Sequence, residues 1–197
     1  MITLFLPPAL ICYAASSAGF IADRATGRAR WTGSAAAALG AGAAFHALDL
    51  AARGIQTGNL PVANFAECLS FIAWLIALIG LVLIVRSRMA IIGAIVGPII
   101  TVATLAAVMT MQTARLVLPE TLRSVWLPIH VTLACLGYSM FVLATAVSLV
   151  YLVYESKLKA KRTMRPASDD VPSLEKLDRI NYRLLVWGFI LLSLAIL

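Results

Sequence analysis

The sequence predicts an all-α fold, a polytopic membrane helix bundle, and three observations lead to this prediction. Hydrophobic residues make up 61% of the 197 residues, charged residues only 13%, and the mean hydropathy is +0.94. A soluble domain is nearer half apolar and a quarter charged. Finally, several uncharged stretches reach the roughly 20 residues that cross a bilayer. We therefore expect residues 1–197 to form a single transmembrane helical domain in a lipid bilayer.

The uncharged stretches predict the spanning helices one by one. The first has no basic residues ahead of it and no small-residue cleavage site after it, so we expect a retained helix and not a signal peptide. The last run is too short for a full crossing. We therefore predict five full transmembrane helices plus a sixth, short or truncated one. The predicted spans are residues 2–22, 33–52, 65–85, 89–111, 128–154 and 184–197.

The distribution of basic residues predicts the orientation. With the N-terminus outside, thirteen of the sixteen Lys and Arg residues fall in inner loops and three in outer loops. Inner loops of membrane proteins carry such an excess, so we expect the N-terminus outside. The same distribution gives no indication of a nucleic-acid partner for the net charge of +7, because the basic residues lie between apolar runs and no soluble domain carries them.

The long inner loop divides into two parts. Residues 157–170, KLKAKRTMRPASDD, are charged and polar. Residues 172–183 have the pattern of an amphipathic helix that Ser173 can cap, with Glu175 and Arg179 spaced to form an ion pair. We expect this segment to lie at the inner membrane surface and to anchor the chain there.

Four ionisable side chains, His46, Asp49, Glu67 and His130, are predicted to fall in the outer half of the membrane. Such groups are costly in lipid and usually face a partner or a cavity. Glu67 follows a loop and could cap its own helix, where the helix dipole favours a carboxylate, with Arg53 as a further partner. Each histidine could make an interhelical hydrogen bond. Alternatively, the two imidazoles ligate a metal.

Among metals, heme iron suits this residue set better than structural zinc. A structural zinc site closes with four ligands, whereas the chain has two histidines and three cysteines with no C-x-x-C pattern. Heme iron needs only one or two axial ligands. Trp126 and Tyr138 flank His130 by one and two helical turns, as aromatic anchors at a membrane interface do. No nucleophile–base pair or phosphate-binding loop is present, so we do not expect the chain to be an enzyme on its own.

Three segments in the same order resemble the cytochrome c assembly protein family, in particular its short CcsA-like and HemX-like members. The first is HALDLAARGIQTGNLPVANFAECLSFIAW (46–74), which contains the G-x-x-P-x-x-N-x-x-E loop. The second is WLPIHVTLACLGYSMFVLATAVSLVYL (126–152), with its W-x-x-x-H start. The third is PSLEKLDRINYRLLVWGF (172–189), an amphipathic lead into the next span.

The resemblance implies a protein that holds non-covalent, b-type heme near the outer face of a bacterial plasma membrane and presents it to apocytochrome c. It makes His46 and His130 candidate axial ligands of the heme iron. Pro61, Asn64 and Glu67 match the loop motif, which we expect to shape the outer mouth of the heme cleft. The implied partners are apocytochrome c and a second cytochrome c assembly subunit.

The sequence also departs from the family's pattern. The tryptophan-rich WWD loop of the family should follow the sixth span, and the chain ends before it, so we expect a member truncated at its C-terminus or one half of a split protein. Two other functions stay open. One is a HemX-like membrane regulator of tetrapyrrole and heme supply, and the other is a cofactor-free membrane scaffold or transporter.

Overall fold

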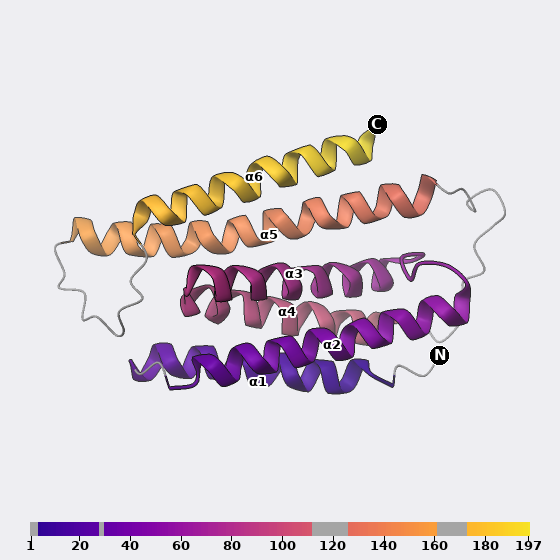
Figure 1. Ribbon diagram of the computed structural model, residues 1–197, viewed down its shortest axis with the longest axis horizontal. Helices are drawn as coiled ribbons and strands as arrows, with labels where there is room; N and C mark the ends of the chain where they lie inside the picture. The colour runs from indigo at the N-terminus through magenta and orange to yellow at the C-terminus, as the bar shows by residue number, and fades with distance from the viewer. Residues whose placement is uncertain (1–3, 28–29, 112–125, 161–172) are drawn as a thin grey trace.

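Lipid offers the peptide backbone no hydrogen-bond partners, so a membrane-embedded chain satisfies its N–H and C=O groups within helices. The computed structural model describes residues 4–27, 30–111, 126–160 and 173–197, and all the regular secondary structure in these ranges is α-helical (Figure 1). The predicted all-α fold is confirmed. The helices are α1 (Leu6–Thr26), α2 (Thr32–Thr57), α3 (Phe65–Ser87), α4 (Ala90–Thr110), α5 (Trp126–Lys159) and α6 (Leu174–Ile196).

The helices form three stacked pairs, and each pair runs antiparallel (Figure 1). The α1/α2 pair and the α5/α6 pair lie on opposite sides of the α3/α4 pair, which contacts both. The bundle consequently has two ends. We call the end where α3 begins, on the right of Figure 1, the Asn64 end, and the end where α3 finishes the Ser87 end.

Five of the described helices, α2 to α6, are long and apolar enough to cross a membrane. The prediction also gave five full spans, but it assigned them to the first five helices, whereas the five found here are the last five. The predicted first span became α1, which is not among the five and which buries the polar side chains Ser16, Ser17 and Asp23.

The helix that contains the predicted sixth span begins ten residues before Leu184. Ser173 accepts a hydrogen bond from the Lys176 N–H at 3.2 Å and starts a helix that continues to Ile196. The predicted amphipathic segment and the predicted last span are therefore one helix of 23 residues. No proline interrupts this stretch, so nothing in the sequence ends the helix near Leu184.

Small residues, among them Gly93 and Gly97 of α4, let the helices approach closely. A methyl group added at Gly93 would lie 2.6 Å from the Phe20 ring, and one added at Gly97 would lie 3.0 Å from the Ser17 backbone. The two glycines thus form the contact between α4 and α1. Such close backbone approach is typical of helix packing in membranes.

Some predictions concern residues outside the described ranges. These are most of the charged segment 157–170, Pro172 at the start of the amphipathic segment, and the basic residues Arg115 and Arg123 of the predicted outer loops.

Candidate functional site

The loop at the Asn64 end is fixed by local hydrogen bonds at both of its borders. Helix α2 ends at Gly58, whose left-handed backbone (φ 68°) lets its N–H bond to the Gly54 carbonyl at 2.9 Å. Glycine adopts this conformation without strain. Helix α3 begins at Asn64, whose side chain accepts a hydrogen bond from the Glu67 N–H at 2.9 Å. The chain between the two helices is therefore held in one arrangement.

Glu67 is the capping acid that the sequence suggested. Its Oε2 accepts a hydrogen bond from the Ala63 N–H at 2.8 Å, just before the helix. Together with the Asn64 bond, this reciprocal pair resembles a capping box. The alternative partner, Arg53, bonds instead to Asp49 within α2. The carboxylate of Glu67 consequently faces its own loop.

Asp49 and Arg53 form a buried ion pair one helical turn apart. The Arg53 Nε lies 2.6 Å from the Asp49 Oδ2, and the two residues are 5% and 2% exposed. The Arg53 Nη2 has no hydrogen-bond partner among the described residues. Removing one member of such a pair would leave an uncompensated charge in the bundle, so both residues stabilise this end only as a pair.

His46 lies at the centre of a buried hydrogen-bond chain across three helices. Its Nδ1 lies 3.3 Å from the Tyr13 hydroxyl of α1, and its Nε2 lies 2.8 Å from the Ser70 hydroxyl of α3. The imidazole is 0% exposed. This is the interhelical hydrogen-bonding role considered in the sequence. Both ring nitrogens already have partners, so an iron ion could be bound only if Tyr13 or Ser70 gave up its bond to the ring.

His130 lies in the first turns of α5 and bonds to α6. Its Nδ1 is 2.6 Å from the backbone carbonyl oxygen of Ala195. A carbonyl can only accept, so Nδ1 carries the proton and the Nε2 of the neutral ring presents a lone pair. This Nε2 has no hydrogen-bond partner among the described residues. Metal-binding histidines usually have this arrangement, in which the far N–H bonds to a backbone carbonyl. His130 therefore fits an axial heme ligand.

The structure does not bring the two histidines into contact. His46 is held between α1 and α3, whereas His130 is held by α6 on the far side of the α3/α4 pair. Within the described ranges, no three side chains of His, Cys, Asp and Glu come together as a metal site. The site is thus a set of separate groups in the half of the bundle nearer the Asn64 end.

An apolar groove at the Asn64 end adds a surface that the sequence did not predict. It has a volume of about 510 Å³, and its lining includes Leu50, Leu60, Pro61, Phe71 and Trp74. The Phe71 and Trp74 rings stack at 5.8 Å, and the Trp74 Nε1 donates to the Ala43 carbonyl at 3.0 Å. The loop motif residue Pro61 consequently lines a groove with two stacked aromatic rings.

The remaining predicted supporting residues, Trp126 and Tyr138, lie on α5 and are each 52% exposed. Neither contributes to the groove. The exposed half of each side chain can face lipid, as expected for aromatic residues near a membrane interface.

Comparison with known proteins agrees with the resemblance noted in the sequence. The family model described as "Cytochrome C assembly protein" matches residues 62–197. A "Cytochrome c biogenesis protein CcsA" from Guillardia theta is 30% identical over 166 residues, which cover 75% of this chain and 55% of the relative. The protein of the same name from Porphyra purpurea is 26% identical over 188 residues, covering 76% of this chain and 59% of the relative.

A further relative with this name, from Synechococcus sp. (strain JA-2-3B'a(2-13)), is 35% identical over 108 residues, covering 53% of this chain and 31% of the relative. No solved structure matches the chain. The chain spans less than two thirds of the length of these curated relatives. Because the family match extends from the loop before α3 to the end of α6, the chain is a multi-pass membrane protein that belongs to the cytochrome c assembly protein family.

Proposed function

We propose that this chain holds a non-covalent, b-type heme near the Asn64 end of its bundle and presents it to apocytochrome c at the outer face of a bacterial plasma membrane. Family membership supports a role in cytochrome c assembly. The observation that carries the heme proposal is the His130 hydrogen bond to Ala195, which directs the Nδ1 proton away and leaves Nε2 as a ligand atom.

In this proposal the residues of the chain bind and orient. Ala195 fixes the tautomer and the ring plane of His130, so the ligand is organised before it binds. The groove lined by Phe71 and Trp74, whose lining includes neither histidine, is a separate apolar and aromatic surface of the kind that suits a flat macrocycle. When bound, the heme itself supplies the vinyl groups to which the cytochrome's thiols add.

The loop motif has a supporting role in the same proposal. The capping bonds of Asn64 and Glu67 hold the start of α3, which carries Phe71 and Trp74. Pro61 lines the groove directly. His46 is the second candidate ligand, for heme held deeper in the bundle, and Tyr13 at its Nδ1 would then be the hydrogen-bond partner that orients the ring.

A second cytochrome c assembly subunit completes the proposal. Heme iron in such sites takes one or two axial ligands. We therefore propose that the partner subunit supplies the second ligand to the iron that His130 binds, and that it contributes to recognition of apocytochrome c.

Visible spectroscopy of the purified full chain tests the heme proposal. Wild type, His130→Gly, His46→Ala and the neighbouring control Ile129→Ala would be loaded with hemin in detergent and recorded oxidised and reduced. We expect a Soret band in wild type and in the control, and a weakened or shifted band in His130→Gly. Added imidazole should restore the His130→Gly spectrum, because it replaces the missing ligand.

The outcomes are distinct. A wild-type chain that takes up no hemin would overturn heme binding by this chain. Hemin uptake that is unchanged in His130→Gly and lost in His46→Ala would transfer the axial role to His46. Bound heme that never reaches an apocytochrome c fragment, with or without the partner subunit, would contradict delivery and favour the regulatory role.

A further inference from the structure

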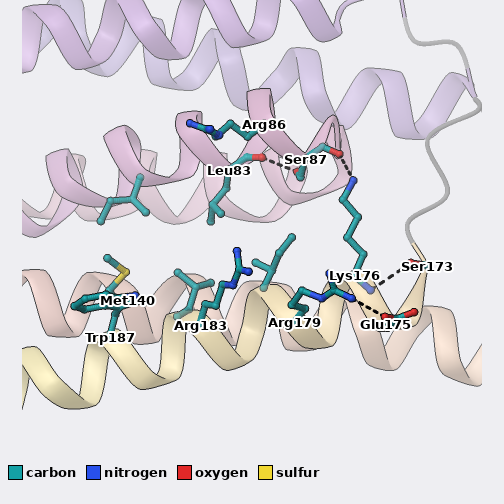
Figure 2. Close-up of a pocket in the computed structure, with 13 residues that line it drawn as sticks. Leu83, Arg86, Ser87, Met140, Ser173, Glu175, Lys176, Arg179, Arg183 and Trp187 are labelled. Atoms are coloured by element: carbon teal, nitrogen blue, oxygen red, sulfur yellow. Dashed lines mark hydrogen bonds and ion pairs between the residues drawn. The ribbon is translucent and has the colours of Figure 1, made fainter.

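A second groove lies at the opposite, Ser87 end of the bundle (Figure 2). It has a volume of about 560 Å³ and lies between the end of α3, the middle of α5 and the first half of α6. It shares no lining residue with the groove at the Asn64 end. Nothing in the heme proposal uses it.

The groove carries an excess of positive charge. Four cationic side chains and one carboxylate line it, which gives a formal balance of three positive charges. The carboxylate, Glu175, is already paired with Arg179 at 2.6 Å. The Lys176 Nζ reaches across from α6 and donates to the Ser87 carbonyl at the end of α3, at 2.7 Å (Figure 2). Lysine is favoured there by the negative end of the helix dipole.

The other two cations, Arg86 and Arg183, have no ion-pair or hydrogen-bond partner in the part of the chain that the structure describes. They come from different helices, and Figure 2 shows Arg183 pointing from α6 toward α3. A guanidinium group offers a planar fork of donors that matches phosphate oxygens. The groove therefore has two arginines available for an anion.

The rest of the groove is apolar and extends into the bundle. Ile79 lies eight residues before Ser87, a distance of about 12 Å along a helix with a rise of 1.5 Å per residue. On α6 the lining positions recur every three or four residues and so form one face of the helix. The apolar lining residues are Ile79, Leu83, Met140, Ile180, Leu184 and Trp187.

We propose that this groove binds an anionic phospholipid, with its phosphate on Arg86 and Arg183 and part of an acyl chain along the apolar wall. A cationic mouth above an apolar wall is complementary to a molecule with an anionic head and a hydrocarbon tail. The charge bias of the loops predicts that the Ser87 end faces the inner leaflet. Basic pockets between transmembrane helices on that side are suited to anionic headgroups. The occupant is thus a component of the bilayer itself.

Native mass spectrometry of the full chain released from detergent micelles tests the proposal. Phosphatidylglycerol is the anionic probe, phosphatidylcholine the neutral one, and glycerol 3-phosphate the headgroup without acyl chains. The groove variant is Arg86→Gln/Arg183→Gln. The control, Arg24→Gln/Arg30→Gln, removes the same charge from residues that do not line the groove. We expect wild type and control to retain one phosphatidylglycerol. The groove variant should bind this lipid at least about tenfold more weakly.

A conservative variant, Arg86→Lys/Arg183→Lys, separates charge from folding, because it keeps both charges and should retain much of the binding. Should the glutamine variant fail to fold, the single substitutions at Arg86 and Arg183 are measured in its place. The Soret band of hemin-loaded protein should be unchanged in every folded groove variant, since the groove lies at the other end of the bundle.

Several results would overturn the proposal. Equal retention of phosphatidylglycerol by wild type and groove variant would remove the site. Equal retention of phosphatidylcholine would remove the preference for an anion. Glycerol 3-phosphate that binds as well as the lipid would identify a site for soluble phosphate compounds. Loss of the Soret band in the groove variant would make the groove part of the heme site. Since heme uptake and lipid retention are read separately, either proposal can fail without the other.

Discussion

At the scale of single residues, one buried imidazole joins three helices. His46 bonds to Tyr13 of α1 and to Ser70 of α3 while it belongs to α2. In an apolar interior, a polar group without a partner is costly, so each of the three side chains depends on the other two. The same bonds make the ring a structural part of the bundle whatever its role toward heme.

Replacing His46 by alanine should therefore destabilise the bundle more than replacing either partner. We expect His46→Ala to lower the free energy of unfolding by about 2 kcal/mol or more, because it leaves two buried hydroxyl groups unpaired and creates a cavity. Ser70→Ala, the control, should cost about 1 kcal/mol. Unfolding in SDS, followed by circular dichroism, measures both. Equal effects of the two substitutions would show that the chain of bonds is not formed.

The sequence predicted local polar contacts, whereas for the distant ones it indicated only that each histidine could bond between helices and did not identify the partners. The Asn64–Glu67 cap could be predicted because its two residues are three positions apart. The Tyr13–His46 and His46–Ser70 bonds join residues 33 and 24 positions apart, and only the packing of α1, α2 and α3 determines them. Likewise, the bond between His130 and Ala195 depends on how α5 and α6 are aligned.

At the scale of the helices, glycine positions determine how closely neighbours approach. A methyl group added at Gly42 of α2 would lie 2.7 Å from two carbon atoms of the Tyr13 ring. At Gly33, on the same helix, nothing lies within 4 Å of such a methyl group. The two glycines therefore form a matched pair, one at a helix contact and one in open space.

We expect Gly42→Ala to weaken the contact between α1 and α2 and to disturb the Tyr13 hydroxyl that bonds to His46. Overpacking of this kind typically costs about 1–3 kcal/mol. Gly33→Ala should be neutral or slightly stabilising, because alanine has the higher helix propensity. Thermal unfolding of both variants in the same detergent distinguishes them. A loss of stability in Gly33→Ala of the same size would indicate a general intolerance of α2 to alanine.

The boundaries of four helices could be predicted from the sequence, and that of α6 could not. Apolar length located α2 to α5 closely, since hydrocarbon thickness dictates the length of a span. It divided α6 wrongly, because its polar first half and apolar second half have different compositions although the backbone is continuous. Composition indicates whether a helical segment lies in lipid or near water, but it does not determine where the helix ends.

At the scale of the whole molecule, the two ends differ in charge. The cationic side chains of the second groove gather at the Ser87 end, where α3 finishes and α6 begins. The loop at the Asn64 end has its acid, Glu67, bonded to Ala63. This asymmetry agrees with the predicted orientation, in which the Ser87 end faces inward.

Cysteine labelling tests the orientation. In a background with the three native cysteines replaced, a membrane-impermeant maleimide should label Asn59→Cys in intact cells and Lys159→Cys only after lysis. Both positions are exposed, one at each end of the bundle. Equal access from outside would show mixed insertion. The reverse pattern would show the opposite membrane topology, with the candidate heme ligands at the inner face.

Helix α6 connects the two ends of the molecule as a stiff rod. Near its start Lys176 donates to the Ser87 carbonyl at the end of α3, and near its finish the Ala195 carbonyl accepts from the ring of His130. Nineteen residues separate these contacts, or about 28 Å of helix. An α-helix hardly compresses along its axis, so the distance between these two contacts is fixed. The contact that orients the His130 ring and the contact between α6 and α3 are therefore made by one rigid element.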